Sequence, residues 1–469
     1  MTDAFAAHAE RTARLVRDLR SAAGQAPLGL VRDSSNLFRD RREPPKQRLD
    51  LSGFDHVLDV DPVRGHVDTE ARITYEALVD GTLAHGVMPA VVPQLKTITA
   101  GGAVAGVGIE ATSFRHGLVH DTLLEADVLL PGGDVVTCRP DNAHRELFLA
   151  LPNSYGTLGY LLRLRLKTIP VRPCVQVEHR RYTAAEPFFA ALQAACDDAG
   201  SDFVDGVVFA ADDLVLNVGR FVDAAPAATS DYTFEQIYHQ SLRSKPRDWL
   251  TCHDWLWRWD TDWFWCSSHF AADRPWLRRL LGRERLNSRT YTRWMRWNAR
   301  WGLTRLLARG RGMRHVESVI QDVDLPMPQA ARFLDWLLAQ IGIVPIWVCP
   351  IRPADPDRTF TLYPLAPGVP YVNFGFWDVV ERRAPLRPGH FNRLVERELG
   401  ALGGIKSLYS DVCYSRAEFD AAYRMDAYAA VKARYDPAGR LLGLYEKCVQ
   451  RACPMRPIER TQCPWRRIR

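Results

Sequence analysis

The sequence predicts an α+β protein with at least two domains. At 469 residues the chain is too long to fold around one ordinary hydrophobic core. Runs with the two-residue period of strands and runs with helical spacing are both frequent. They do not alternate regularly, as a doubly wound dinucleotide-binding fold would require. Hydrophobic residues make up 47% of the chain and charged residues 25%, which is typical of a globular protein.

The first 170 residues contain the clearest local patterns. Residues 1–22 predict a short amphipathic helix and lack the apolar stretch of a secretory signal. A hairpin is predicted around the turn Pro62–Gly65, where apolar and polar residues alternate on both sides. A helix is predicted from Thr74 to Gly86, and two further strands are predicted around Pro131–Gly133.

Two glycine-rich segments interrupt these patterns. The segment Thr97–Gly117, TITAGGAVAGVGIEATSFRHG, follows a proline-punctuated loop and is itself predicted to be a loop. Within it, Gly106–Ala111 fits the short dinucleotide pattern G-x-G-x-x-A. No clean apolar strand precedes this pattern and no long amphipathic helix follows it, so a Rossmann-type site is not expected. NSYGTLG at residues 153–159 predicts a second tight glycine loop.

Positive charge and tryptophan are concentrated in one middle region. Residues 274–314 contain thirteen arginines against a single acid, Glu284, and ten of the fourteen tryptophans fall between Trp249 and Trp301. The arginines at 285, 289, 293, 296 and 300 and the tryptophans at 294, 297 and 301 recur at helical spacing on adjacent faces. We expect residues 274–314 to bind to an anionic membrane surface. The main alternative is a solvated helical insert with its aromatics in the core, and nucleic acid is not expected as a partner.

The glycine segments resemble a known family. Residues 97–136 followed by 153–170 resemble the FAD domain of the vanillyl-alcohol oxidase / p-cresol methylhydroxylase (PCMH) superfamily. The resemblance implies that the T-x-GG turn approaches the FAD pyrophosphate and that the G-T-L-G loop lies along the dinucleotide. Glycines suit such an approach, and consecutive N–H groups can form an anion nest. The implied FAD-binding residues are Ser35, Asn36, Thr97, Ile98, Thr99, Gly101, Gly102, Gly108, Ile109, Glu110, Ser113, His116, Gly117, Gly156, Thr157 and Gly159.

The expected FAD is non-covalent. Many members of the superfamily attach FAD through a histidine just after the glycine turn, but the corresponding residues 106–111 read GVGIEA. His116 follows at a distance and is expected to be a flavin-pocket residue. No metal site is expected.

Three further motifs extend the resemblance beyond the FAD domain. IQDVDLP (320–326), VPIWVCP (344–350) and SLYSDVCYSRAEF (407–419) resemble Δ24-sterol reductases and the actinobacterial reductases of methylene-branched fatty acyl chains. The resemblance implies reduction of a carbon–carbon double bond in a lipid with NADPH as co-substrate, and a functional pairing with a lipid methyltransferase. An FAD oxidase or dehydrogenase of an alcohol or sugar remains an alternative, as does a non-catalytic lipid-binding protein.

Reduction of an isolated double bond requires a proton donor across the alkene from the hydride source. Tyr409 and Asp411 in KSLYSD, with Lys406 beside them, are the best-placed candidates; for Tyr409, simple core packing is the alternative. Gln321 resembles a family position that points at the substrate, with an ordinary strand end as the alternative. The residues expected to line the substrate channel are Trp347, Cys349 and Arg352.

The expected domain organisation follows from these assignments. We expect a two-subdomain PCMH-type FAD-binding domain at 1–174 and an α/β substrate domain at 175–425, which includes a helical, Trp/Arg-rich insert at 246–316. A helical segment at 426–452 is expected to pack back on the FAD domain, and a basic tail at 453–469 follows. The expected location is cytoplasmic, peripheral on the inner face of the cell membrane.

Overall fold

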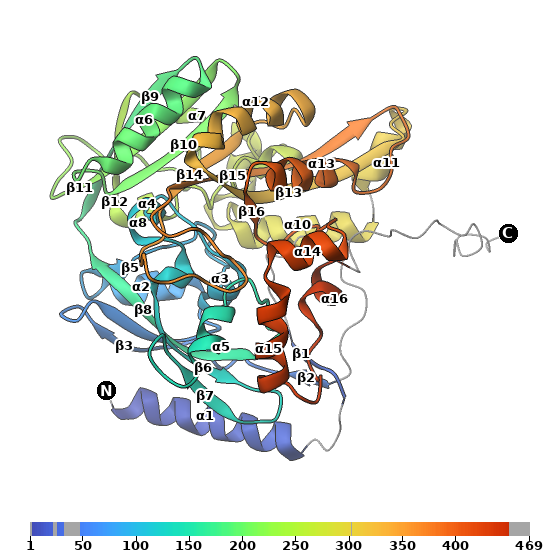
Figure 1. The fold of residues 1–469 in the computed structure, drawn as a ribbon. Coiled ribbons are helices and arrows are strands. Elements are labelled where there is room, and N and C mark those ends of the chain that lie inside the picture. Colours follow the sequence, from blue (N-terminus) through green and yellow to red (C-terminus); the bar gives the residue numbers. More distant parts are fainter. Residues whose placement is uncertain (1, 22–25, 32–46, 302, 450–469) are drawn as a thin grey trace.

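The protein is built around two main β-sheets. A computed structural model describes residues 2–21, 26–31, 47–301 and 303–449. The first sheet has six strands in the order β3-β4-β8-β6-β7, with β5 paired to β8, and lies in the lower half of Figure 1. Its strands are β3 (Val57–Asp61), β4 (His66–Glu70), β5 (Val87–Pro89), β6 (Leu123–Leu129), β7 (Val135–Cys138) and β8 (Tyr160–Pro170). A separate parallel pair joins β1 (Leu28–Leu30) and β2 (Gln47–Leu49).

The elements of this first half follow local sequence signals. The hairpin β3–β4 turns at Pro62–Gly65 and the pair β6–β7 turns at Pro131–Gly133, as predicted. Thr74 caps the predicted helix, since its hydroxyl accepts a hydrogen bond from Ala77 N at 3.3 Å. The helices are α1 (Thr2–Ser21), α2 (Tyr75–Leu83), α3 (Ala100–Gly106), α4 (Ser113–His116) and α5 (Arg145–Ala150).

The glycine-rich segment differs from its prediction, because its first part is the helix α3 and not a loop. Thr99 caps this helix through its hydroxyl, which accepts from Gly102 N at 3.2 Å. A Cβ added at Gly101 would lie 2.9 Å from both Cβ and O of Ala71. The glycine therefore allows α3 to pack directly against the chain that leaves β4.

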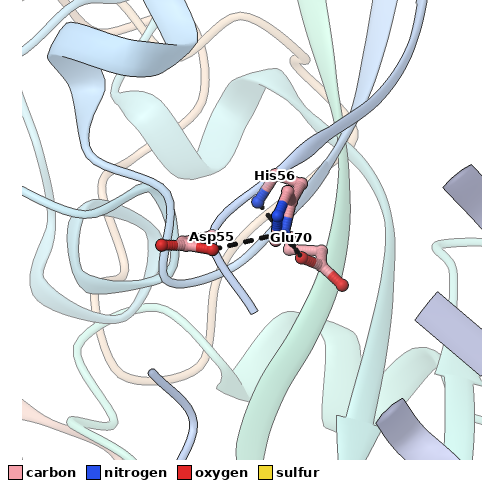
Figure 2. Close-up of side chains that lie close together, drawn as sticks. All are labelled: Asp55, His56 and Glu70. Atoms are coloured by element: carbon pink, nitrogen blue, oxygen red, sulfur yellow. Dashed lines mark hydrogen bonds and ion pairs between the residues drawn. The ribbon is translucent and has the colours of Figure 1, made fainter. Parts of the chain in front are cut away.

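The N-terminal helix α1 is held to the first sheet by one buried carboxylate, Glu70 at the end of β4. Nδ1 of His8 lies 2.7 Å from Glu70 Oε1, and Arg11 donates to the same oxygen at 2.7 Å. From the sheet side, His56 contacts Glu70 Oε2 through its backbone N and its Nδ1, and Figure 2 shows His56 between Asp55 and Glu70. Burial alone would raise the pKa of Glu70, but the bonds from His8, Arg11 and His56 outweigh it and lower the pKa to about 2.

We expect Glu70 to make stability depend on acidic pH. A carboxyl whose pKa is lower in the folded protein contributes its full stabilisation above its ordinary pKa of 4.5, and loses it as the pH falls towards about 2. The loss should be on the order of 3 kcal/mol. Chemical unfolding at stepped pH tests this: wild type should weaken across the window from about 4.5 to about 2, whereas Glu70→Gln should start weaker and change less. Parallel curves for the two proteins would contradict the assignment.

The second sheet has eight strands in the order β12-β9-β11-β10-β14-β15-β13-β16 and lies in the upper half of Figure 1. Its strands are β9 (Cys174–Tyr182), β10 (Phe203–Ala210), β11 (Asp213–Val222), β12 (Arg247–Thr251), β13 (His315–Pro326), β14 (Ile346–Ile351), β15 (Tyr371–Arg382) and β16 (Ile405–Lys406). The change from one sheet to the other falls between Pro170 and Cys174. Helices and strands are thus mixed across two sheets, which confirms the predicted α+β class.

The two faces of the second sheet have different neighbours. Apolar side chains of one face, such as Val323 and Phe374, share a core with the helices α6 (Ala185–Asp197), α12 (Ala330–Gln340) and α13 (His390–Ala401). We call the opposite face the inner face. It packs against the first sheet and the middle region in a second, larger hydrophobic core, to which Trp347 and Trp377 belong.

The remaining helices lie beside or between the sheets. The middle region forms α7 (Tyr238–Ser241), α8 (Cys252–Leu256), α9 (Pro275–Leu281), α10 (Ser288–Trp301) and α11 (Leu303–Gly310). The chain ends in α14 (Arg416–Ala422), α15 (Met425–Tyr435) and α16 (Leu444–Cys448), which run down beside the first sheet in Figure 1. Lys432 of α15 donates to Thr157 O at 2.7 Å and joins this segment to the second glycine loop. Within the described ranges, no helix is both long and apolar enough to cross a bilayer.

Candidate active site between the glycine loops and the inner face

The two glycine segments and the segment that contains Tyr409 meet at the inner face of the second sheet. The loop at 153–159 joins them: Tyr155 places its hydroxyl 3.4 Å from Gly106 O, and Asn153 Oδ1 accepts from Leu408 N at 3.2 Å. Segments that are some 50 and 250 residues apart in sequence therefore come together here. Tyr409 follows directly after Leu408, so its side chain lies at this junction.

Tyr409 forms a hydrogen-bonded group with Trp377 and Asp322. The indole Nε1 of Trp377 donates to the Tyr409 hydroxyl at 2.9 Å, and that hydroxyl also bonds to the Asp322 carboxyl. All three side chains are only partly buried, although they lie at the inner face. The ring of Trp377 packs against Phe264 and Trp265, with centroids 4.8 and 5.6 Å apart, so the polar group has aromatic surroundings.

Asp322 was not among the predicted site residues. It stands opposite Gly375 in the β13–β15 pair, and a Cβ at Gly375 would lie 2.8 Å from Asp322 Oδ1. This Oδ1 is buried without a hydrogen-bond partner in the described part of the chain. Burial raises the pKa of Asp322 to about 7, the bond from Tyr409 opposes the rise, and the neighbouring Asp324 adds to it. A carboxyl with these properties can hold a proton near neutral pH.

Two of the other predicted catalytic residues, Lys406 and Gln321, support the segment that contains Tyr409 and the third, Asp411. Lys406 is fully buried, pairs with Glu396 at 3.0 Å and donates to the backbone O of Asp411 at 2.7 Å. Gln321 donates to the same backbone O at 3.1 Å and accepts from the Ser410 hydroxyl at 3.1 Å. Lys406 and Gln321 point to the helix-covered face, since successive side chains of a strand alternate and Asp322 occupies the inner face.

These contacts correct the roles predicted for Lys406 and Gln321. The polar groups of Lys406 and Gln321 form hydrogen bonds that support the loop 407–411. These two residues therefore position Tyr409 and do not reach the inner face. For Asp411, the described contact is through its backbone carbonyl.

The predicted channel residues have separate locations. Trp347 lies at the inner face, where its Nε1 donates to Asp205 Oδ2 at 3.2 Å and its ring packs near Phe264. Cys349 is fully buried, with its Sγ 3.2 Å from Glu110 O. The side chain of Arg352 is partly exposed and pairs at 2.8 Å with Asp197, the last residue of α6 on the helix-covered side. Arg352 is therefore a surface ion-pair residue, which corrects its predicted role.

Glu110 takes part in a buried ion cluster that joins both sheets to the middle region. Arg258, with a fully buried side chain, donates to Glu110 Oε1 at 3.1 Å and to Asp205 Oδ2 at 2.8 Å. Its guanidinium also lies 3.7 Å from the ring centroid of Trp255. Burial raises the pKa of Glu110 to about 7, and Arg258 opposes that rise. The side chain of Glu110, one of the predicted FAD-binding residues, is thus engaged in an ion pair.

The T-x-GG turn contains no nest of free amides. Ala100 N donates to Ile73 O at 2.9 Å, Gly101 N to Ala71 O at 2.8 Å, and Gly102 N to the Thr99 hydroxyl. The predicted anion nest at this turn is therefore wrong, because protein acceptors take all three N–H groups. Of the two residues before the turn, Thr97 is partly buried and Ile98 accepts a hydrogen bond from Tyr75 N at 2.8 Å.

The next predicted residues connect the loop to the second sheet. Ser113 accepts a bond from Glu110 N at its hydroxyl, and its backbone O accepts from Arg352 N at 3.1 Å. Gly108 N donates to Ala103 O, and Gly117 N to Ser113 O. Burial, with nearby Lys167 and Arg115, lowers the pKa of His116 to about 4, so this imidazole is neutral at pH 7.

Several amides in the glycine loops have no acceptor among the described residues. Two of them are the backbone N–H groups of Ile109 and Leu158, although Leu158 is fully buried. A buried N–H group requires an acceptor, so that of Leu158 indicates contact with an acceptor-rich molecule, and that of the partly exposed Ile109 is free to join it. Gly156, Thr157 and Gly159 surround Leu158 in this loop. The predicted residues Ser35 and Asn36 lie outside the described residues.

Residues 7–139 match the protein family described as FAD binding domain. This part of the chain is an FAD-binding domain. The chain is also similar to proteins named Delta(24)-sterol reductase. It is 23% identical to the one from Arabidopsis thaliana over 85% of this chain and 76% of that protein, and 24% identical to the human one over 77% and 70%. A shorter similarity, 28% identity over 44% of this chain and 40% of the other, connects it to Cytokinin dehydrogenase 10 of Oryza sativa subsp. japonica.

The protein is thus an FAD-dependent oxidoreductase, which confirms the predicted cofactor and its superfamily. The described residues fit FAD: the available N–H groups of Ile109 and Leu158 suit its phosphate and ring acceptors, and glycines occur in both loops. We expect these loops to hold the cofactor, with Tyr409 and Asp322 facing them from the second sheet.

Proposed function

We propose that the protein reduces a carbon–carbon double bond in a lipid, using FAD and electrons from NADPH. The Tyr409–Asp322 hydrogen bond carries this proposal, because it puts two proton-holding groups among the aromatic rings of Trp377, Phe264 and Trp265. An isolated alkene has no carbonyl to polarise it, so its reduction requires a proton donor in a water-poor site. Similarity to proteins named Delta(24)-sterol reductase supports the same reaction class.

Each group at this site has a distinct task in the proposed reaction. When bound, FAD supplies the hydride that originates from NADPH. Tyr409 and Asp322 hold the proton for the other alkene carbon. Trp377 orients the Tyr409 hydroxyl through the bond from Nε1, and Phe264 and Trp265 keep water away from it.

The proposed substrate is a methylene-branched fatty acyl chain or a sterol side chain. Protonation of such branched alkenes produces a tertiary cation, which is the easiest cation for a hydride to meet. A methylene-branched chain would have to come from a reaction that adds a one-carbon unit to an unsaturated lipid, so the proposed functional partner is a lipid methyltransferase.

Anaerobic half-reactions test this function. NADPH should bleach the flavin of the purified protein rapidly, and a methylene-branched lipid should restore the oxidised spectrum and be recovered as the saturated product. Bleaching by an alcohol or sugar, without NADPH oxidation, would instead favour an oxidase or dehydrogenase, the alternative that the similarity to a cytokinin dehydrogenase supports. Colourless protein that binds lipid would favour a non-catalytic role.

We also propose that the middle region docks on an anionic membrane surface, from which the lipid substrate is taken. Four large apolar side chains of this region are exposed: Trp276 by 65%, Leu280 by 72%, Trp297 by 58% and Leu307 by 68%. Trp276 and Leu280 are four residues apart on α9 and share one face. Exposed arginines of the same region that have no acidic partner among the described residues, such as Arg285 and Arg293, supply positive charge. The earlier tryptophans, such as Trp255 and Trp259, are core residues and do not contribute.

Co-sedimentation with vesicles tests the membrane proposal. Wild type should bind vesicles that contain anionic lipid more strongly than neutral ones. Trp276→Ser/Leu280→Ser should lower the binding constant about tenfold or more, because two apolar side chains no longer enter the interface. Val63→Ser is the matched control, since Val63 is 95% exposed on the β3–β4 turn, and it should leave binding unchanged. Absence of wild-type binding to both kinds of vesicle would refute the proposal.

A further inference from the structure

The strand β13 carries two acids, Asp322 and Asp324, side by side on the inner face. They are two residues apart, and they stand opposite Gly375 and Asn373 in the β15 partner strand. Acids are rare on a strand face that is buried in a large protein core, and each needs partners there. The two carboxyls differ sharply in what they contact.

Asp324 has a partner for each of its oxygens. Tyr363 donates its hydroxyl to Oδ2 at 2.7 Å, and Asn373 donates its Nδ2 to Oδ1 at 2.7 Å. Hydrogen bonds donated to both oxygens favour the ionised form of a carboxyl. Asp322, by contrast, has an unpartnered buried Oδ1 and shares its bond with a hydroxyl that can accept as well as donate.

This difference fixes which of the two acids keeps a proton. Two neighbouring carboxyls with unlike surroundings titrate apart, and the one with fewer donors is protonated first. The ionisable groups that act on Asp322 are Asp324 on its own strand and Tyr409 on the loop after β16. Accordingly, burial raises the pKa of Asp322 to about 7, whereas the bonds from Asn373 and Tyr363 restrain the rise for Asp324, whose pKa is about 6.

Tyr409 alone is a poor source of a proton. Burial, with the Asp322 carboxyl, holds the pKa of its hydroxyl well above 10. A phenol in this state can give up its proton only if another acid replaces it in the same event. Asp322 is bonded to the Tyr409 hydroxyl and is the nearest group able to do so.

We infer that Asp322 supplies the proton of the reaction and passes it through the Tyr409 hydroxyl, while Asp324 keeps Asp322 protonated. The inference rests on the proposed function. The alkene π pair takes the Tyr409 proton to form a C–H bond, the Tyr409 oxygen takes the proton of Asp322, and Asp322 is left as a carboxylate. The second carbon receives the hydride, and water reprotonates Asp322 between turnovers. Asp324 is a positioning residue in this scheme.

An infrared titration of the purified protein tests this inference without turnover. Wild type should show the C=O stretch of a buried protonated carboxyl at pH 6, and this band should fade as the pH rises through about 7. Glu110 also has a pKa of about 7 and Asp324 one of about 6, so the difference spectrum, wild type minus Asp322→Asn, should isolate the band that the variant lacks. Asp324→Asn should keep the Asp322 band, but the band should fade at lower pH, because the neighbouring negative charge that favours protonated Asp322 is gone. A difference spectrum, wild type minus Asp322→Asn, that contains no such band, or a midpoint that Asp324→Asn leaves in place, would overturn the inference.

Turnover measurements complete the test. Asp322→Asn should bind FAD and be reduced by NADPH as wild type is, but reduce the alkene about 100-fold more slowly or worse. Asp324→Asn should move the pH profile of alkene reduction to lower pH. Normal alkene reduction by Asp322→Asn would overturn the inference while leaving the proposed function intact. Wild type that is reduced by NADPH but never reoxidised by the alkene would refute the proposed function, whatever the infrared titration shows.

Discussion

Replacement of Arg258 by alanine is expected to destabilise the protein by about 3–5 kcal/mol. The change removes the only cation that we find beside Glu110 and Asp205 among the described residues, and it leaves both carboxylates buried without their ion pair. The guanidinium also packs on Trp255, so the variant loses a filled space as well. Denaturant unfolding at neutral pH should show the loss as a lower midpoint. The deficit should shrink as the pH falls towards about 7, because loss of Arg258 raises the pKa of Glu110 further and the variant takes up a proton there before wild type does.

Arg279→Ala is the matched control for this prediction. Arg279 also forms an ion pair, with Glu235 at 3.0 Å, but the two side chains are 66% and 45% exposed. Exposed pairs contribute at most about 1 kcal/mol, so the unfolding midpoint should hardly change. Equal losses of unfolding free energy in the two variants would contradict the prediction, because the buried ion cluster would then stabilise the protein no more than an exposed ion pair does.

Elements with a local sequence signal could be predicted. The helix after Thr74 has a hydroxyl cap, and the turns at Pro62–Gly65 and Pro131–Gly133 contain residues that only turns favour. In each case the decisive interaction lies within a few residues of the signal or within a motif of the family.

Features that depend on packing could not be predicted. Three glycines lower the helix propensity of residues 100–106, but the cap from Thr99 and the close contact with Ala71 make them helical. In the middle region, helical spacing identifies faces and does not say which face is buried. Trp259 is fully buried and Trp297 is 58% exposed, so one composition serves both core and surface.

The acid at the candidate site was missed although the sequence contains a signal for it. In VIQDVDLP the positions 322 and 324 share one face of a strand, and a buried face of this kind is normally apolar. Two acids there predict a functional or ion-paired role. Gln321 was predicted to be a catalytic residue because it resembles a family position. Side chains alternate along a strand, however, so Gln321 points to the opposite face from Asp322.

Tyr409→Phe is expected to slow alkene reduction about 100-fold or more, while FAD content and the rate of flavin reduction by NADPH stay as in wild type. Phenylalanine keeps the ring in place but removes the only group that connects Asp322 to the reacting carbon in the proposed relay. Trp377 Nε1 would lose its acceptor, at a cost in stability of about 1–3 kcal/mol.

Stopped-flow measurement of the two half-reactions separates these effects, and Tyr435→Phe controls for the loss of a hydroxyl. Tyr435 also hydrogen-bonds through its hydroxyl, to His144 Nδ1 at 2.9 Å, but it does so at the contact of α15 with the start of α5. Its variant should reduce the alkene at nearly the wild-type rate. If Tyr409→Phe did the same, the proton would have to reach the alkene without Tyr409. Asp322, which lies next to Tyr409 and faces Gly375 of β15, would then have to transfer its proton directly.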